Sequence, residues 1–238
     1  MKSKVGSVAI FALLIAALVW APGYRDVVET VNRAAADAVV VLDPGHGGID
    51  GGAESSDGMS EKDINLAIAA ELKKELEKKN IQVILTRDED EGLYDKSQKG
   101  AIRSLKTQDM QARREVIDKA DADLAVSIHL NSFTQDTSVR GAQVFYPSAG
   151  EESLTGESKK AAELIQEGLN KDINVTMSRS ALGKSDVYLL QNITCPIVIV
   201  ECGFLSNPVD AQNLKKSGHQ KKIVKSMLKS ICTYLEKN

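Results

Sequence analysis

Four side chains with metal-binding or acid–base chemistry follow or open apolar segments of this 238-residue chain. His46 lies in the glycine-rich stretch VVLDPGHGGIDGG (residues 40–52), and His129 follows a strand-like run in AVSIHLNS. Glu201 follows the apolar run IVIV, and Glu61 opens a segment with helical periodicity. Two histidines and one carboxylate are a known ligand set of catalytic zinc, which leaves a fourth position open. A further glutamate supplies the acid–base group that hydrolysis needs.

Each of these residues also has an ordinary interpretation when it is taken alone. A histidine can fill a loop or satisfy its hydrogen bonds in a core, and a glutamate in a first helical turn is favoured by the helix dipole. Glu201 is harder to explain in this way, because a buried carboxylate without a partner is costly. The glycines around His46 fit a backbone that approaches a metal and a substrate closely. The four residues together therefore favour a metal-dependent hydrolase.

Two other sites are excluded by the spacing of the residues. The zinc helix motif H-E-x-x-H is absent. The glycine loop fails as a dinucleotide-binding fingerprint, because Asp50 stands where a third glycine is needed. The three cysteines form neither an even set nor a C-x-x-C pair, which favours buried thiols over disulfides or redox chemistry.

Strands and helices alternate along the chain, which predicts an α/β sheet covered by helices on both faces. Ser60 and Asp63 resemble a capping box at the start of the first helix. We expect the four candidate residues to gather at the carboxyl ends of the strands. The expected strands are 39–42, 81–86, 124–130, 143–146, 187–190 and 197–200; the expected helices are 60–79, 111–119, 159–169 and 220–235; and residues 88–108 are expected to form a long loop.

The length and the first residues predict the domain organisation. Lys2 and Lys4 precede an apolar run, so residues 1–22 are expected to be a signal peptide or a membrane anchor that engages the export machinery or the membrane. Residues 23–37 would be a linker, and residues 38–238 a single domain. The formal net charge of −3 gives no reason to expect nucleic-acid binding, and the lysines of the last helix fit a solvated face.

Four blocks of the sequence resemble the zinc-dependent N-acetylmuramoyl-L-alanine amidases of the amidase_3 family. They are LDPGHGGIDGGA, SEKDINLAIA, ADLAVSIHLNS and VIVECGFLSN, in the family's order, and the resemblance covers residues 38–238. The compact layout without wall-binding repeats is similar to the germination-specific, CwlD-type group of spore-forming bacteria. The resemblance implies a single α/β domain with a six-stranded, mostly parallel sheet.

The resemblance also implies the chemistry of the site. His46, Glu61 and His129 would bind one Zn²⁺ ion, and Glu201 would be the catalytic glutamate. The substrate would be the amide between N-acetylmuramic acid and L-alanine in peptidoglycan, cleaved for muramic δ-lactam formation in spore cortex. The enzyme would then act outside the cytoplasm, in the cell envelope or the forespore intermembrane space. An accessory protein that positions it would fit the lack of wall-binding repeats.

Other interpretations remain open at this point. A zinc carboxypeptidase or deacetylase would keep the metal and cleave a different bond, and a wall-binding module without activity would have no need of Glu201. Asp43 and Asn131 are candidates for the groups that orient the ligating histidines, because such histidines usually donate their second nitrogen. Arg113 is expected to be structural, since it would connect a helix to the His46 loop.

Overall fold

Six strands form one sheet in the order β2-β1-β3-β6-β4-β5 in the computed structural model, which describes residues 36–95, 97 and 101–236. The first four strands in this order pair in parallel; β4 runs antiparallel to β6, and β5 runs parallel to β4. The predicted six-stranded, mostly parallel sheet is therefore confirmed. The strands are β1 (Ala38–Pro44), β2 (Ile81–Leu85), β3 (Leu124–Asn131), β4 (Gln143–Pro147), β5 (Leu182–Lys184) and β6 (Ile197–Phe204).

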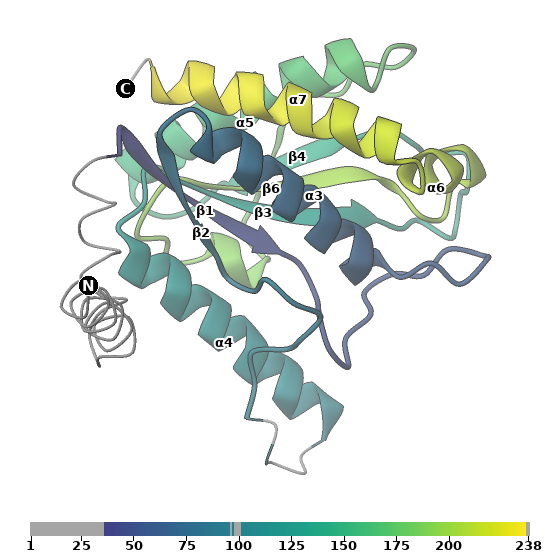
Figure 1. Ribbon diagram of the computed structural model, residues 1–238, viewed down its shortest axis with the longest axis horizontal. Helices are drawn as coiled ribbons and strands as arrows, with labels where there is room; N and C mark the ends of the chain where they lie inside the picture. The colour runs from purple at the N-terminus through teal and green to yellow at the C-terminus, as the bar shows by residue number, and fades with distance from the viewer. Residues whose placement is uncertain (1–35, 96, 98–100, 237–238) are drawn as a thin grey trace, which may run out of the picture. The chain divides into compact units, whose positions relative to one another are not determined.

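Helices cover both faces of the sheet, as the alternating pattern predicts (Figure 1). One face packs against α3 (Glu61–Glu77), α5 (Glu152–Asp172) and α7 (Ser217–Leu235). The other face packs against α4 (Ile102–Ala120) and the short 3₁₀ helix η1 (Tyr188–Leu190). The short helix α6 (Pro208–Leu214) follows β6 directly.

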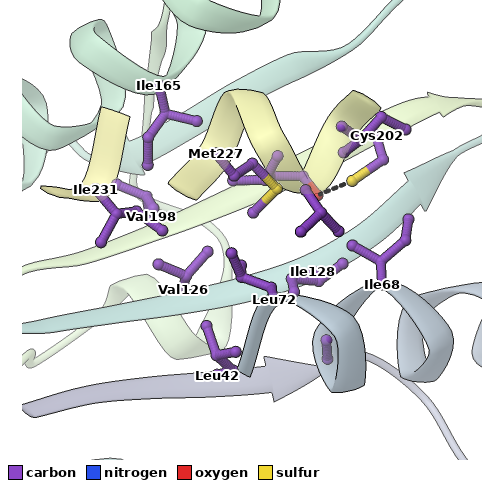
Figure 2. Packing of buried hydrophobic residues seen from close by; sticks show 14 of the residues in the cluster. Leu42, Ile68, Leu72, Val126, Ile128, Ile165, Val198, Cys202, Met227 and Ile231 are labelled. Atoms are coloured by element: carbon purple, nitrogen blue, oxygen red, sulfur yellow. Dashed lines mark hydrogen bonds between the residues drawn. The ribbon is translucent and has the colours of Figure 1, made fainter. Parts of the chain in front are cut away.

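The period of two along each strand sorts the side chains between these two faces. Leu42, Val126 and Val198 point into the larger core under α3, α5 and α7, where Leu72 and Met227 meet them (Figure 2). Their neighbours along the strands belong to the smaller core under α4. The polar side chains of β3 and β6 that belong to the candidate site point to this second face. Helix α4 therefore faces them.

The predicted strand at 187–190 is wrong. The chain forms the 3₁₀ turn η1 there, and the sixth strand is β5, five residues earlier. Leu189 and Leu190 are both buried in the smaller core. Consecutive residues of a strand would point to opposite faces of the sheet, whereas a tight turn places both leucines on one side.

The loop predicted for 88–108 is also wrong from residue 102 onward, because α4 begins at Ile102. Its buried face consists of only Leu105, Arg113, Ile117 and Ala120, so the apolar repeat is too sparse to indicate a helix from sequence. Helix α5 begins seven residues before its predicted start, and α6 was not predicted. The proposed capping box is wrong, since the Ser60 side chain makes no capping hydrogen bond.

The predicted signal or anchor at 1–22 and almost all of the linker at 23–37 lie outside the described residues. Within residues 36–236, as far as they are described, no helix is long and apolar enough to cross a membrane. Cys195 and Cys202 are buried free thiols, as expected, while Cys232 is only half-buried.

Candidate metal centre and catalytic pocket

Two strands bring His129 and Glu201 side by side. The two residues are direct partners in the register between β3 and β6, and both point to the face covered by α4. Glu201 lies within β6, which continues to Phe204, rather than at the end of its strand. The pairing places an imidazole and a carboxylate next to each other at the carboxyl rim, where the sequence predicted them.

Three of the four predicted residues converge to a cluster that could hold a metal ion. Ligand atoms of His46, Glu61 and His129 all lie within 4.8 Å of one another. Glu61 Oε1 is 3.2 Å from His46 Nε2 and 3.0 Å from His129 Nδ1. The two imidazole rings meet edge to face, with centroids 4.9 Å apart. The cluster joins the loop after β1, the first residue of α3 and the rim of β3.

Glycines in the His46 loop leave room for the cluster. A Cβ at Gly45 would lie 2.2 Å from His129 Cε1, and a Cβ at Gly52 would lie 2.6 Å from Glu61 Oε2. Any larger residue at either position would therefore displace a candidate ligand. His46 itself has a φ of 63°, a left-handed conformation that is uncommon for a residue other than glycine. The bare loop thus makes space for ligand side chains, in addition to the close backbone approach that the sequence suggested.

Asp50 orients His46. Its Oδ2 accepts a hydrogen bond from His46 Nδ1 at 3.0 Å, which leaves Nε2 facing Glu61. The other oxygen of Asp50 lies 2.8 Å from Lys106 Nζ on α4. Burial alone would lower the pKa of His46, but the hydrogen bonds to Asp50 and Glu61 raise it to about 9. Asp50 was not predicted to orient His46. A carboxylate four residues after a candidate ligand could have indicated this role, because ligating histidines usually donate their second nitrogen to such a group.

Glu61 is held as an anion by a dense set of donors. Its Oε1 accepts from the Leu130 N–H at 3.0 Å and its Oε2 from the Ala53 N–H at 2.8 Å. Asn65, one turn along α3, donates to the same carboxylate. Burial alone would raise the pKa of Glu61, but the two histidines hold it well below its usual range. This carboxylate is therefore ionised and fixed in place, as a metal ligand must be.

Glu201 has the opposite environment. Its Oε2 is buried without a hydrogen-bond partner among the described residues. Burial, reinforced by the nearby charge of Glu61, raises the pKa of Glu201 to about 7, although His129, His46 and Lys184 oppose the shift. A carboxyl group that titrates near neutrality is suited to take up and return a proton. The two glutamates of the site therefore differ in their chemistry because their surroundings differ.

Arg113 connects α4 to the strand end and the loop. Its guanidinium lies 2.7 Å from Asp43 Oδ1, and it donates to the backbone carbonyls of Pro44 and His46. Arg113 and Asp43 are each 1% exposed. Burial alone would raise the pKa of Asp43, but Arg113 and neighbouring hydroxyl groups hold it below its usual range. The structural role expected for Arg113 is confirmed by these contacts.

The two residues suggested as partners of the histidines bind elsewhere. Asp43 accepts hydrogen bonds from Thr86, Ser127 and Arg113. Asn131 Oδ1 accepts from the backbone of Ser132. Neither residue makes a hydrogen bond to His46 or His129 in the described structure, and Asp50 fills the role for His46.

A pocket of about 270 Å³ opens beside the cluster. His46, His129 and Glu201 line one end, and apolar side chains that include Phe145, Leu189 and Ile199 line the wall towards β4. A polar reacting centre beside an apolar wall is the usual form of a small-molecule or peptide site. Water held at Glu201 would lie next to the metal-binding cluster.

The chain is similar to one family along most of its length. The family model described as N-acetylmuramoyl-L-alanine amidase, Amidase_3, matches residues 40–233. A germination-specific N-acetylmuramoyl-L-alanine amidase of Bacillus subtilis is 37% identical over 196 residues, which cover 82% of this chain and 79% of that protein. The amidase AmiA of Escherichia coli is 29% identical over 237 residues, with 82% and 75% of the two chains covered.

Solved structures share the fold. The CwlD amidase of Clostridioides difficile, determined in complex with the GerS lipoprotein, has a TM-score of 0.80 and 38% identity. The match covers 84% of this chain and 100% of that one. An N-acetylmuramoyl-L-alanine amidase of Clostridium difficile 630 has a TM-score of 0.71 at 28% identity, over 85% and 98% of the two chains.

We predict that Arg113→Met lowers the free energy of unfolding by about 3–5 kcal/mol at neutral pH, because it leaves the Asp43 charge buried without its partner. Urea denaturation would measure the loss, with Arg103→Met as the control, since Arg103 is exposed on the same helix. A loss below about 1 kcal/mol would show that the pair is not holding the loop.

The ion pair between Arg113 and Asp43 also determines how this loss of unfolding free energy depends on pH. In the wild type the pKa of Asp43 is lowered, so the stability it contributes is present above the unfolded value, about 3.9, and is lost as the pH falls through the folded value. In Arg113→Met the largest influence that opposes the burial of the Asp43 charge is removed, and protonation relieves that buried charge. The difference between the two proteins should therefore shrink on acidification.

Proposed function

Since this chain belongs to the Amidase_3 family of N-acetylmuramoyl-L-alanine amidases, we propose how its own residues carry out the cleavage of peptidoglycan and in which cell-wall process they do so. The reaction is hydrolysis of the amide that joins the lactyl group of N-acetylmuramic acid to L-alanine. The observation that carries the proposal is the cluster of His46, Glu61 and His129 beside Glu201, whose Oε2 is buried, with a pocket lined by His46, His129 and Glu201.

The bond that is cleaved can be identified from the products. We expect the full chain, loaded with zinc, to release free stem peptides that begin with L-alanine and to leave glycan strands with intact N-acetyl groups. Mass spectrometry of digested peptidoglycan would measure both. Release of D-alanine would instead indicate a carboxypeptidase, and release of acetate a deacetylase.

We propose that His46, Glu61 and His129 hold one Zn²⁺ ion. Two histidines and a carboxylate are a donor set of catalytic zinc; their ligand atoms lie within 4.8 Å of one another, with Glu61 Oε1 3.2 Å and 3.0 Å from the two histidine nitrogens. When bound, zinc supplies a Lewis acid that polarises the scissile carbonyl and lowers the pKa of water. Asp50 holds His46 with Nδ1 protonated, which directs the free Nε2 towards the cluster.

We predict that zinc affinity rises with pH until about pH 9. The pKa of His46 in the metal-free chain is about 9, and a ligating nitrogen must lose its proton, so zinc competes with protons below that pH. Competition with a chelator at a series of pH values would measure the affinity. Removing the carboxylate in Asp50→Asn should lower the pKa of His46, so the rise of zinc affinity with pH should occur at lower pH.

His219 provides the control, because it lies on α7 outside the cluster. His219→Ala should keep the affinity and its pH dependence. An affinity for zinc that does not change between pH 7 and pH 9 in the wild type would remove His46 from the proposed ligand set.

We propose that Glu201 is the general base and acid. Glu201 takes a proton from the attacking water and returns it to the leaving nitrogen of L-alanine. The support is its place beside His129 in the sheet, its orphaned buried oxygen and its pKa near 7. The rigid β6 fixes the carboxylate, as a positioned proton carrier requires.

We predict that Glu201→Gln lowers the turnover rate by about 10²–10⁴-fold and leaves the zinc content unchanged, because the amide keeps the shape and loses the proton-accepting group. Turnover and elemental analysis of the same preparation would test both statements. Glu115→Gln on the exposed face of α4 is the matched control. Loss of zinc from the Glu201→Gln variant would make Glu201 a ligand, and wild-type turnover would remove it from the mechanism.

We propose that the chain acts on spore cortex, outside the cytoplasm, after export through residues 1–22, as a cleaved signal or an anchor. The support is its similarity to a germination-specific amidase and the location of peptidoglycan beyond the cytoplasmic membrane. Amide cleavage leaves a free lactyl carboxylate on muramic acid, which is the group that δ-lactam formation requires. An accessory protein is also proposed, because the similar CwlD amidase was solved with a lipoprotein bound.

A further inference from the structure

The charges that line the pocket leave one cation without an acidic partner. Three basic residues line it: Lys106, Arg113 and Lys184. Lys106 pairs with Asp50, and Arg113 pairs with Asp43 and Asp109. Within the described part of the chain, no carboxylate lies within ion-pair distance of Lys184. Its Nζ instead lies 4.9 Å from the centroid of the Phe145 ring.

The sheet places Lys184 at the end of the pocket away from the metal-binding cluster. Lys184 is the last residue of β5, the edge strand, which pairs with β4. Phe145 on β4 lies opposite Ile199 on β6, and Glu201 follows two residues later on the same face. Two strand spacings, about 10 Å, separate β5 from β6. Lys184 pairs with Pro147, four residues along β4 from Gln143, the partner of Glu201, so its backbone is displaced from Glu201 along the strands as well as across them. The ammonium group therefore faces the same pocket as Glu201, across the apolar wall.

The substrate has one free charge close to the scissile amide on its peptide side. N-acetylmuramic acid and L-alanine carry no charge on either side of the scissile amide once they are joined in peptidoglycan. The next residue, D-glutamate, is linked through its γ-carboxyl group, so its α-carboxylate is free. It lies two residue lengths from the reacting carbonyl, roughly 7 Å at about 3.5 Å per residue. The ammonium group of Lys184 lies over Phe145, whose strand partner Ile199 is two residues from Glu201, so it faces the part of the pocket into which that carboxylate would extend.

We propose that Lys184 binds the α-carboxylate of the second stem residue and thereby selects stem peptides in which this group is a free acid rather than an amide. The inference rests on the amidase reaction proposed above. The stem peptide would then run from the metal-binding cluster along the apolar wall towards β5, and the neutral glycan would leave in the other direction. Stacking on Phe145 holds the ammonium group in place and partly shields it from water.

Two synthetic substrates that differ in one group test the proposal. Both carry N-acetylmuramic acid and L-alanine, followed by either D-glutamate or D-isoglutamine, and are cleaved by the zinc-loaded full chain. A charged hydrogen bond of this kind predicts that Lys184→Met lowers kcat/KM for the acid about 10- to 100-fold, mainly through KM. The amide substrate should change little. Lys184→Arg should recover most of the loss, and Lys225→Met on the exposed face of α7 should have no effect.

Binding of the product provides a readout apart from turnover. Calorimetry should show that the L-alanyl-γ-D-glutamate dipeptide binds the wild type more tightly than the Lys184→Met variant, while the isoglutamine dipeptide binds both equally.

Three results would overturn the proposal. Equal losses with both substrates would mean that Lys184 acts on a group common to them. A shifted acid limb of the pH–rate profile in Lys184→Met, without a change in substrate preference, would mean that it acts through Glu201. If the Lys184→Met variant shows no loss of kcat/KM for either substrate, Lys184 contacts Phe145 and does not bind the substrate. Failure of the wild type to cleave either substrate would contradict the amidase reaction itself, and is thus distinguishable.

Discussion

A guanidinium buried between a helix and a strand end holds the His46 loop in place. Arg113 reaches from α4 to the Asp43 carboxylate and to the carbonyls of Pro44 and His46. A loop rich in glycine has little side chain with which to fix its own conformation, and each glycine has a large conformational entropy to lose on folding. Charged hydrogen bonds to its backbone replace the missing packing. The contact of Arg113 with the His46 carbonyl and the hydrogen bond of Asp50 to the ring both hold His46 in its left-handed conformation.

The surroundings of the two glutamates explain how one small site holds them in different states. Glu61 opens a helix and receives backbone N–H groups and two imidazoles, which favour its anion. Glu201 lies in a buried strand and receives none of these donors at Oε2. A metal ligand has to be ionised, and a proton carrier has to titrate near the working pH. Local hydrogen bonding and burial therefore separate two chemically identical side chains into two roles.

The face of the sheet that carries the candidate residues also lines the pocket. His129, Glu201, Ile199 and Phe145 all point towards α4, so the reacting groups and the apolar wall share one surface. Helix α4 and η1 border this surface, and the larger core on the opposite face supplies the stability. Both layers contribute to the site: α3 supplies Glu61 at its first residue, and α4 supplies Arg113 and Lys106.

The sequence by itself determined the alternation of strands and helices and the apolar strands 39–42, 124–130 and 197–200, and it supplied the four candidate site residues. These signals are local, because side-chain periodicity and a polar residue beside an apolar run depend only on neighbours along the chain. The tertiary structure alone decided that Asp50 rather than Asp43 orients His46, that Arg113 pairs with Asp43, and that Lys184 has no acidic partner among the described residues. It also decided the long helix α4 and the turn at 188–190, whose buried side chains are recognisable only from what they pack against. Most of these depend on residues far apart in sequence, and even the Asp50–His46 contact, four residues apart, depends on the folded loop, so their distances and burial exist only in the folded chain.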